Sequence, residues 1–477
     1  MATEYPFFSR GQARRSDEAF EVKAPYDGVV VGLAYRASAR DLEDAIAATA
    51  EAFEQTRALP SHRRAEILQR VAAALTARQE EIARTLALEA GKPIKAARTE
   101  VGRSIFTFTN AAEEAKRIEG ELLPLDLTAA SEGRWAIVRR FPLGPIAGIT
   151  PFNFPLNLVA HKVAPAIASG NSIVLKPATQ TPLTALTLAG IFHEAGLPAG
   201  GFNVLPCAPK TAEPLATDDR LKLLTFTGSP AVGWALKQKA GRKRVTLELG
   251  GNAGVIIHDD ADLVYAAERC AFGGFTYAGQ TCISVQRIFV HESIYDEFTE
   301  RFLAFTRQLR VGDPLDEAAD IGPMINLGEA ERAAQWVKEA VEGGARLLCG
   351  GERHGALMQP TVLAETDPEM RVNCQEIFAP VVTLARYRDF DQAVEQVNHS
   401  NYGLQAGLFT SDLRAVFRAF ERLDVGGVIV GDVPTYRADH MPYGGVKESG
   451  QGREGIRYAI EEMTERKVMV LNLAQPR

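Results

Sequence analysis

The sequence predicts an α/β fold made of two α/β domains and a small β arm. Three observations predict it: strand-like runs alternate with helical stretches from Gly144 onward, the alternation starts again after Gly250-Gly251, and two further strand-like segments lie outside both series. Alternation of this kind is typical of parallel sheets that helices cover on both faces. The length of 477 residues is compatible with two large domains or about three smaller ones.

The first third of the chain is predicted to be helical. Apolar residues recur at helical spacing in residues 39–59, and Ser61 is placed to cap a second helix that ends at Gly91. A third helix is expected over about residues 96–117. We assign these helices to the first domain.

Two series of strand-like runs define the expected sheets. In the first domain they cover residues 146–149, 172–175, 202–205, 221–227 and 245–247. In the second they cover residues 255–258, 287–290, 346–349, 381–387, 406–409 and 427–430. A hairpin-like stretch at 122–142 and a terminal strand at 468–472 remain, and together they could form a sheet shared between subunits.

The composition is that of a globular chain and excludes several function classes. Hydrophobic residues make up 46% of the chain, charged residues 24%, and the formal net charge is −7. Such a chain lacks the concentrated basic surface that nucleic-acid binding requires. No apolar run reaches the roughly 18 residues of a membrane span, and the N-terminus has no signal-peptide pattern. We therefore expect no nucleic-acid and no membrane partner.

Cysteine usage points to a reducing, cytoplasmic location. The five cysteines are odd in number and widely spaced: Cys207, Cys270, Cys282, Cys349 and Cys374. They include no CxxC pair, so neither a disulfide framework nor a metal site is predicted. A lone cysteine is usually a small buried hydrophobic residue.

The strand–turn–helix junction at Gly228 is a candidate phosphate site. No GxGxxG follows a predicted strand, so the standard dinucleotide fingerprint is absent, and GxxxxGK[ST] is not formed at Gly228 and Gly233 because Trp234 stands where that motif needs Lys. Instead, a buried-strand run at 223–227 leads into Gly228-Ser229-Pro230, and Ser before Pro favours a helix start. A helix N-terminus at the end of a parallel strand can hold a phosphate. An ordinary turn would have the same pattern.

Three further side chains belong to turns where chemistry is possible. Cys282 follows Ala278-Gly279-Gln280-Thr281, Glu248 ends a strand before two glycines, and Asn153 lies between two prolines at a strand end. Each of them alone is typical of a turn or of core packing. As a set they provide a nucleophile, a carboxylate and an amide.

Seven motifs follow one another along the chain: ITPFNFP (149–155), IVLKPATQTP (173–182), FTGSPAVG (226–233), LELGGN (247–252), AGQTCIS (278–284), EIFAPV (376–381) and MPYGGVKESGQGREG (441–455). In their sequence and order they resemble the aldehyde dehydrogenase superfamily, and the resemblance runs from about residue 20 to the C-terminus. The later motifs most resemble the branch with lactaldehyde, phosphonoacetaldehyde and non-phosphorylating glyceraldehyde-3-phosphate dehydrogenases.

The resemblance implies a domain plan and an assembly. A Rossmann-like NAD(P)-binding domain would comprise residues 1–120 and 144–250, and a catalytic α/β domain residues 251–446. The oligomerisation arm would comprise residues 121–143 and 447–477. A homodimer or homotetramer is what the family resemblance implies.

The resemblance also implies that an aldehyde is oxidised to its acid through a thioester. A thiolate is a strong nucleophile whose thioester water can cleave, and this role falls on Cys282. Asn153 and the Cys282 backbone N–H would stabilise the oxyanion, with about 3–4 kcal/mol from the side-chain amide. Glu248 would activate water, an effect of about 10²–10⁴-fold. Lys162 matches a position proposed to relay protons, although an exposed helical lysine is the commoner explanation.

The matched positions imply NAD or NADP as cofactor. Lys176 would bind the adenosine ribose, Ser229 the pyrophosphate and Glu376 the nicotinamide ribose, while Phe378 would pack at the nicotinamide. NAD-preferring members commonly carry Glu three residues after this Lys, where Thr179 stands here, so a 2′-phosphate is not repelled. This favours NADP, with relaxed use of both cofactors as the alternative. The remaining groove residues would be Thr150, Pro151, Phe152, Gly228, Val232 and Leu249.

Positions matched to the substrate tunnel carry unusual residues. Arg103 and Arg437 replace the common Met, Leu or Phe, His161 replaces a common Trp, and His440 lies beside the mouth. Arginine suits bidentate capture of an acidic group, so we expect a short aldehyde with a carboxylate, phosphate, phosphonate or sulfonate. Relatives that bind dianions often have Arg where Thr281 stands, which argues against a dianion. A neutral hydroxyaldehyde such as lactaldehyde is the alternative.

Two other functions compete with this one. A dehydrogenase that passes the thioester to coenzyme A would not need a hydrolytic base, so the presence of Glu248 argues against it. A non-enzymatic relative would be expected to have lost Cys282, Glu248 or Asn153, and all three are present.

Overall fold

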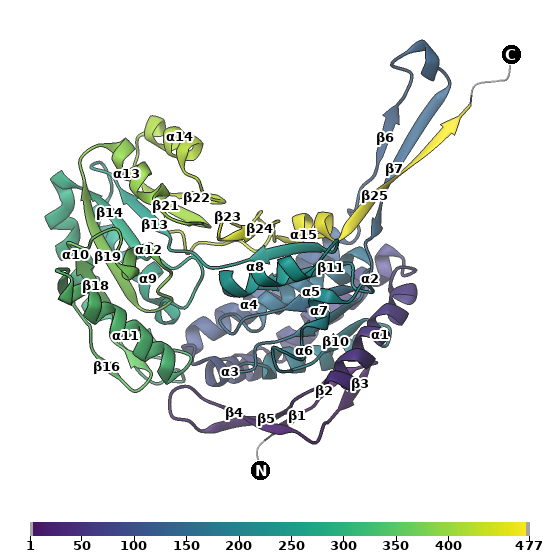
Figure 1. Ribbon diagram of the computed structural model, residues 1–477, viewed down its shortest axis with the longest axis horizontal. Coiled ribbons are helices and arrows are strands. Elements are labelled where there is room, and N and C mark those ends of the chain that lie inside the picture. The colour runs from purple at the N-terminus through teal and green to yellow at the C-terminus, as the bar shows by residue number, and fades with distance from the viewer. Residues whose placement is uncertain (1–2, 474–477) are drawn as a thin grey trace.

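Figure 1 shows the computed structural model, in which residues 3–473 are described. Two sheets surrounded by helices lie side by side, and a narrow arm of strands projects from one of them. The α/β fold class predicted from the sequence is confirmed. No helix among the described residues is long and apolar enough to cross a membrane.

The first unit is built on an eight-stranded sheet. Its central strands, from β12 to β10, run parallel; β24 and β2 pair antiparallel with the ends of this series, and β3 pairs antiparallel with β2. The carboxyl ends of these central strands therefore share one edge of the sheet. In spatial order the strands are β24 (Gly450–Gln451), β12 (Arg244–Glu248), β11 (Leu223–Thr227), β8 (Ile146–Ile149), β9 (Ile173–Lys176), β10 (Phe202–Val204), β2 (Phe7–Ser9) and β3 (Gln12–Arg14).

The helices of this unit come from both ends of the chain. Buried side chains of α1–α6 and α15 form one core with β8–β11. Helix α5 is buried along its whole length, so its polar residues point into the interior. The helices are α1 (Ala39–Thr56), α2 (Ser61–Ala77), α3 (Gln79–Ala90), α4 (Ile94–Glu114), α5 (Asn157–Ser169), α6 (Leu183–Glu194), α7 (Pro214–Thr217), α8 (Pro230–Lys239) and α15 (Ile456–Glu462).

One predicted helix differs from the structure. The helix expected from Ser61 to Gly91 is two helices, because the backbone of Arg78 (φ −113°, ψ 20°) leaves the helical region and separates α2 from α3. Ser61 is the first helical residue and not the cap, since Pro60 takes the cap position without a side-chain hydrogen bond. Gly91, with φ 66°, ends α3 in the left-handed conformation that favours glycine.

The second unit is built on a seven-stranded sheet. All its strands run parallel except the edge strand β15. Their order is β15 (Arg346–Cys349), β18 (Thr361–Ala364), β19 (Val381–Tyr387), β14 (Arg287–His291), β13 (Gly254–Ile257), β21 (Gln405–Phe409) and β22 (Gly427–Val430). The helices are α9 (Leu263–Phe275), α10 (Tyr295–Gln308), α11 (Leu327–Glu342), α12 (Arg371–Cys374), α13 (Phe390–Asn398) and α14 (Leu413–Arg422).

The arm is a three-stranded antiparallel sheet of β25 (Thr464–Asn472), β7 (Arg134–Pro142) and β6 (Glu121–Pro124). It joins the predicted hairpin to the predicted terminal strand within one subunit, as Figure 1 shows. Inside the range 447–477, however, β24 pairs with β12 and α15 belongs to the first core, so β25 is the strand that enters the arm sheet. The domain boundaries themselves stay a prediction.

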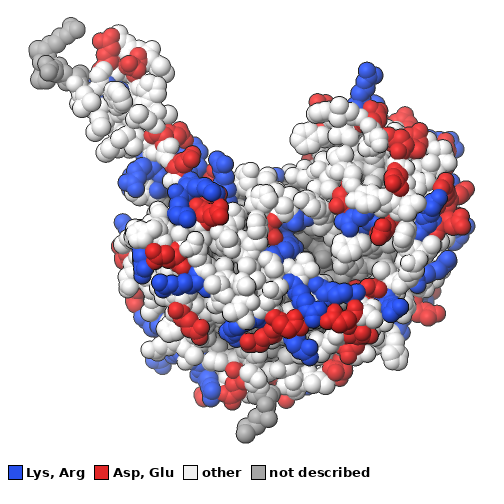
Figure 2. Space-filling view, turned by 180° about the vertical axis from the view of Figure 1, so that it is seen from behind, with Lys and Arg blue, Asp and Glu red and all other residues white. Residues whose placement is uncertain are grey.

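The remaining elements are short. The strands before α1 were not predicted, because runs of two to six residues carry little periodic signal. They include the sheet of β1 (Glu4–Tyr5), β5 (Val30–Tyr35) and β4 (Ala19–Lys23). Two small hairpin-like pairs join β16 (Arg353–His354) to β17 (Leu357–Met358) and β20 (Tyr402–Gly403) to β23 (Val446–Lys447). Acidic and basic side chains intermingle over the face in Figure 2.

Candidate active site

Several predicted site segments lie at the carboxyl ends of neighbouring parallel strands. Ile149 pairs in register with Lys176 and with Phe226, and Thr227 pairs with Glu248. The loop after β8, Lys176, the Gly228 turn and Glu248 therefore share one edge of the first sheet. In open α/β sheets, ligands bind in the crevice at this edge.

Cys282 lies on a turn between α9 and β14 that has an unusual backbone. Tyr277 and Ala278 have φ values of 50° and 53°, a conformation that is uncommon for residues with a side chain. A Cβ on the next residue, Gly279, would lie 2.1 Å from the carbonyl oxygen of Ala379, so only glycine fits there. The turn leaves Cys282 half-buried.

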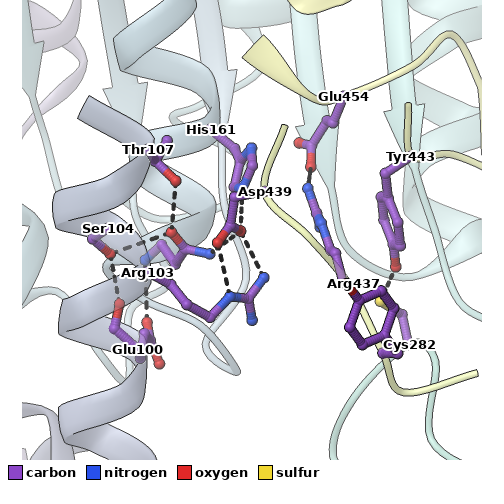
Figure 3. A network of polar contacts seen from close by, with 12 residues as sticks. Glu100, Arg103, Ser104, Thr107, His161, Cys282, Arg437, Asp439, Tyr443 and Glu454 are labelled. Carbon is purple, nitrogen blue, oxygen red and sulfur yellow. Dashed lines mark hydrogen bonds and ion pairs between the residues drawn. The ribbon is translucent and has the colours of Figure 1, made fainter. Parts of the chain in front are cut away.

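The sulfur of Cys282 has a hydroxyl neighbour. The Tyr443 oxygen lies 2.9 Å from Sγ, as Figure 3 shows. Burial raises the pKa of the Cys282 thiol to about 12, while the Tyr443 hydrogen bond and the charge of Arg437 act to lower it. The thiol is therefore protonated at neutral pH, and a nucleophilic role requires a base.

Glu248 has a buried carboxyl group close to the Tyr443 segment. Its side chain is buried, and neither oxygen has a hydrogen-bond partner among the described residues. A Cβ on Gly444 would lie 2.8 Å from Oε1, so the carboxylate packs against the residue that directly follows Tyr443. Burial and the negative charge of Glu454 raise the pKa of Glu248 well above its usual range. A buried carboxyl group of this kind is a candidate acid or base.

The two glycines after Glu248 bring another carboxylate and Cys282 close together. A Cβ on Gly250 would lie 2.0 Å from Glu376 Oε2, and one on Gly251 would lie 2.8 Å from the Cys282 carbonyl oxygen. The Gly251 N–H donates to Glu376 Oε1 at 2.9 Å, while burial raises the pKa of Glu376 to about 7. The predicted segments around Glu248, Cys282 and Glu376 are thus in direct contact.

Asn153 lies on a loop that a buried ion pair holds in place. Lys92 Nζ donates to the Asn153 carbonyl oxygen at 2.8 Å and pairs with Glu100. The other Glu100 oxygen accepts the N–H groups of Leu156 and Asn157, at 3.0 and 3.1 Å, at the start of α5. The ion pair therefore fixes both the loop and the helix that follows it.

Aromatic contacts connect this loop to its surroundings. Lys92 Nζ lies 4.0 Å from the ring centre of Phe154 and 4.4 Å from that of Tyr277, which belongs to the turn before Cys282. Phe152 packs edge-on against Phe378, with ring centres 5.9 Å apart. Residues 150–154 thus contact both the Cys282 turn and the Glu376–Phe378 segment.

Lys162 belongs to a buried chain of charges and is not an exposed helical lysine. Its Nζ donates to the hydroxyls of Thr225 (3.1 Å) and Thr227 (2.7 Å) and to Glu454 (3.2 Å). The second Glu454 oxygen accepts from Arg437 at 2.9 Å. Although burial by itself raises the pKa of Glu454, the charges of Lys162 and Arg437 lower it to about 2. Glu454 is therefore a permanent anion.

Asp439 organises a second polar network, shown in Figure 3. Arg103 approaches it with two nitrogens, at 3.1 and 2.7 Å, and His161 Nε2 lies 2.9 Å away. Against the effect of burial, His161 and Arg103 hold the pKa of Asp439 below its usual range. Two nitrogens of Arg103 are thus bonded to Asp439, and the expected contact of Arg103 with an acidic group on the substrate stays a prediction.

A cavity of about 710 Å³ lies beside the Cys282 turn. Arg437 Nε and Thr281 Oγ1 are buried without a hydrogen-bond partner among the described residues, and both residues line the cavity. His161 and His440 are not among its lining residues: His161 is buried against Asp439, and His440 is exposed. Other lining residues are Lys92, Arg103, Phe154, Phe272, Tyr277 and Tyr436.

Comparison with known proteins identifies the family. A family model described as Aldehyde dehydrogenase family matches residues 12–469. The chain belongs to this family. A 3-sulfolactaldehyde dehydrogenase from Priestia aryabhattai is 47% identical to it over 471 residues, or 98% of each chain.

Solved structures agree over the whole chain. Aldehyde dehydrogenase 21 from Physcomitrella patens, in complex with the reaction product succinate, has a TM-score of 0.98 and 47% identity over 99% of both chains. The glyceraldehyde-3-phosphate dehydrogenase GapN from Methanocaldococcus jannaschii, complexed with NADP, has a TM-score of 0.92 and 40% identity over 96% of this chain and 99% of its own. The protein is an NAD(P)-dependent aldehyde dehydrogenase.

The first sheet of this aldehyde dehydrogenase has groups that fit a dinucleotide. Helix α8 begins at Pro230, and Ser229 in the cap position makes no capping hydrogen bond, so the N–H groups of the first turn are open to a phosphate. Lys176 Nζ is buried and donates to the Pro177 carbonyl oxygen at 3.3 Å. No carboxylate within residues 3–473 pairs with it. Val232, which is half-exposed, lies in the first turn of α8.

The other predicted cofactor residues lie on the same strand ends. The Thr150 hydroxyl is buried and has no hydrogen-bond partner in the described part of the chain. Pro151 and Phe152 are half-buried beside it, Thr179 is half-buried after β9, and Leu249 is buried after β12. A dinucleotide along this edge would satisfy polar groups that otherwise have no partner.

Sequence reasoning missed several charged and polar residues of the site in this dehydrogenase. Tyr443 and Glu454 were part of a quoted motif, but nothing in the motif indicates which residues they contact. Asp439 was passed over between two residues that were named, and the buried pair of Lys92 with Glu100 had no signal beyond ordinary helix charges. Each contact joins segments far apart in the sequence.

Proposed function

We propose that this dehydrogenase oxidises a short anionic aldehyde to its carboxylic acid through a thioester on Cys282. The observation that carries the proposal is the cavity beside the Cys282 turn, which Arg437 and Thr281 line; the Nε–H of Arg437 and the hydroxyl of Thr281 have no hydrogen-bond partner among the described residues. Buried donors without partners are costly, and an anion that accepts from both would satisfy them.

The first step would form the carbon–sulfur bond. Glu248 takes the Cys282 proton, the sulfur attacks the aldehyde carbon, and the carbonyl π electrons move to oxygen. The Asn153 amide and the Cys282 N–H would stabilise that oxyanion. Support comes from the rigid surroundings of both groups, since the Lys92–Glu100 pair holds the Asn153 loop and Gly251 packs against Cys282.

The second half would release the acid. Bound NAD(P) supplies a hydride acceptor, and the tetrahedral carbon becomes a thioester when it gives up its hydride. Glu248, which is buried and has no hydrogen-bond partner among the described residues, first releases to solvent the proton that it took from Cys282, and then takes a proton from water as the water oxygen attacks the thioester carbon. The carbon–sulfur bond breaks, its electron pair goes to the sulfur, and the carboxylic acid leaves.

Arg437 is the residue we assign to the anionic group. Its Nη2 is occupied by Glu454 at 2.9 Å, while its Nε is unpaired. The relatives point the same way: sulfolactaldehyde, glyceraldehyde 3-phosphate and the acid form succinate are all anionic near neutral pH. Thr281 adds a neutral donor, which suits a monoanion or a hydroxyl group.

The substrate proposal is tested with a panel of aldehydes. Succinic semialdehyde, phosphonoacetaldehyde and glyceraldehyde 3-phosphate are compared with lactaldehyde and propanal. Arg437→Lys keeps the charge beside Glu454 but removes the Nε donor, and should lower the preference for anionic aldehydes about 10- to 100-fold, since a charged hydrogen bond contributes about 1.5–3 kcal/mol. Arg98→Lys, on the exposed face of α4, is the matched control. An unchanged preference would favour the neutral hydroxyaldehyde.

The thioester route and its fate are tested separately. Cys282→Ser should abolish NAD(P)H formation, because an alkoxide nucleophile would need far more activation than a thiolate. If the enzyme instead transferred its acyl group to coenzyme A, NAD(P)H formation would depend on added coenzyme A. We expect no such dependence, since the free carboxylate of Glu248 is what hydrolysis requires.

We further propose that NADP is preferred. Thr179 stands where NAD-preferring relatives commonly carry a carboxylate. Arg36, which pairs with Glu18, adds positive charge that acts on Lys176. Burial, and also the charge of Arg36, lower the pKa of Lys176. Thr179→Glu should raise the KM for NADP about tenfold or more relative to that for NAD, because like charges repel. Equal effects on both would contradict the proposal.

The assembly we propose is a homodimer or homotetramer built through the arm, with domains as assigned from the sequence. Strand β25 is an edge strand with exposed Val468, Met469 and Val470, and α14 beside edge strand β22 exposes Phe417 and Phe420. Such apolar edges are normally covered. Sedimentation should give a dimer or larger for the native chain and a smaller species for Val468→Asp with Val470→Asp on the arm strand β25.

A further inference from the structure

The hydroxyl of Tyr443 is the sole hydrogen-bond partner of the Cys282 sulfur within residues 3–473, at 2.9 Å. No motif comparison assigned this residue a role. When the sulfur is a thiolate it has no proton to give, so in that state the tyrosine must be the donor. The contact is therefore able to act on the charged form of the nucleophile.

The surroundings of Tyr443 fix the direction of this hydroxyl. Its backbone is paired with Glu454 by two hydrogen bonds, of 3.1 and 2.7 Å. The Arg437 guanidinium lies 3.7 Å from the centre of its ring, and the ring packs with Ile283 and Leu404 in a small apolar cluster. Tyr443, Arg437 and Glu454 thus contact one another next to the sulfur, and Figure 3 shows the Tyr443–Cys282 and Arg437–Glu454 contacts.

We propose that Tyr443 is a catalytic residue, whose hydroxyl donates a hydrogen bond to the Cys282 sulfur whenever that sulfur carries negative charge. The inference rests on the proposed role of Cys282 as the nucleophile. It goes further in naming a group that stabilises the thiolate.

The charge appears on sulfur at two points of the cycle. Before attack, the thiol proton has moved to Glu248 and the sulfur holds an extra electron pair. That pair then forms the bond to carbon, and the charge passes to the carbonyl oxygen. During hydrolysis the carbon–sulfur bond breaks and the electron pair returns to sulfur. Glu248 then gives the sulfur the proton that it took from water. The phenol proton stays on Tyr443 throughout, because burial holds the pKa of that hydroxyl well above its usual range.

Stabilising the thiolate raises the rate of attack, because the gain in thiolate fraction is larger than the loss of intrinsic reactivity. Burial keeps the thiol far from ionisation at neutral pH. Each unit by which its pKa falls raises the thiolate fraction about tenfold, whereas the intrinsic reactivity of the thiolate falls only about threefold. The rate therefore rises about threefold per unit as long as the pKa stays above the working pH.

The experiment measures alkylation of Cys282 by iodoacetamide as a function of pH, followed by mass spectrometry of the peptide that carries Cys282. We compare the native enzyme with Tyr443→Phe, which keeps the ring under Arg437. The midpoint should rise by about one to two units, and alkylation at pH 7.5 should slow about three- to tenfold. The pre-steady-state burst of NAD(P)H should slow with it, while KM for the aldehyde changes little. Tyr265→Phe, on the exposed face of α9, is the control for the same chemical change and should match the native enzyme.

A second variant covers the case in which Tyr443→Phe does not fold. Site-specific replacement of Tyr443 by 3-fluorotyrosine makes the phenol a stronger donor and should move the alkylation midpoint to lower pH. Midpoints that do not move in the folded variants would overturn the inference. Failure of the proposed function is distinct, because Cys282→Ser would then retain NAD(P)H formation whatever Tyr443 does.

Discussion

Glu248 and Glu454 are two buried glutamates of one site, 3% and 2% exposed, with opposite surroundings. Neither oxygen of Glu248 has a hydrogen-bond partner among the described residues. Glu454 has Lys162 at 3.2 Å on one oxygen and Arg437 at 2.9 Å on the other. Both carboxylates lie near Tyr443: Glu454 pairs with its backbone, and Glu248 packs against the next residue.

The difference shows that partners, more than burial, decide what a carboxyl group can do. Burial raises the pKa of both groups, but two cations bring that of Glu454 down to about 2, and the resulting negative charge raises that of Glu248 further. Glu454 thus stays ionised and holds Arg437, whereas Glu248 can bind and release a proton. Paired carboxyl groups with pKa values driven apart are typical of acid–base sites.

The largest expected effect comes from replacing Glu248, whose carboxyl group has no hydrogen-bond partner among the described residues. Glu248→Gln should lower steady-state turnover about 10²–10⁴-fold, because hydrolysis loses its general base. Because Glu248 also takes the Cys282 proton, the acyl-enzyme should form more slowly than in the native enzyme, which the mass increase on Cys282 after acid quenching measures. The exposed neighbour Glu448→Gln should keep native turnover. Turnover within a few-fold of native in Glu248→Gln would remove the distinction between the two carboxylates.

The next effect concerns stability and the paired glutamate. Lys162→Met leaves Glu454 buried with one cation in place of two, and should lower the free energy of unfolding by about 3 kcal/mol. Urea denaturation measures it. Lys338→Met, which breaks an exposed pair with Glu342, is the control and should change little. Equal losses in the two variants would mean that the buried pair contributes no more than a surface one.

A pH profile sharpens the comparison without a large loss of activity. Glu248 is active when ionised, and its pKa is raised, so thioester hydrolysis should fall as pH drops through that raised value. Glu454→Gln removes the negative neighbour and leaves the cations Lys162 and Arg437, which lowers the pKa of Glu248. The acid limb of single-turnover hydrolysis should therefore move to lower pH. A move to higher pH would contradict the electrostatic coupling.

The smallest effect is expected at the second arginine–carboxylate pair. Arg103 is 26% exposed and Asp439 5%, so this pair is more exposed to solvent than the pair of Arg437 and Glu454. Arg103→Lys loses one of the two hydrogen bonds and should cost about 1 kcal/mol of stability in denaturant titration. A loss larger than that of Lys162→Met would reverse the ranking of the two networks.

Much of the fold could be predicted because its signals are local. The strands at 381–387 and 427–430 lie where the sequence placed them, since runs rich in β-branched residues and bounded by turn residues favour strands. The break at Arg78 was missed, because apolar spacing continues across it. Motif order likewise identified Cys282 and Glu248 as candidates but gave no information on Tyr443.

The sequence by itself determined the alternation of strands and helices, and hence which residues follow parallel strands along one edge. Only the tertiary structure decided which charges meet: Arg103 and Asp439 are 336 positions apart, and Lys162 and Glu454 are 292 apart. Pairing and proton affinity depend on distance through space and on exclusion of water, and neither quantity is encoded in the spacing of residues along the chain.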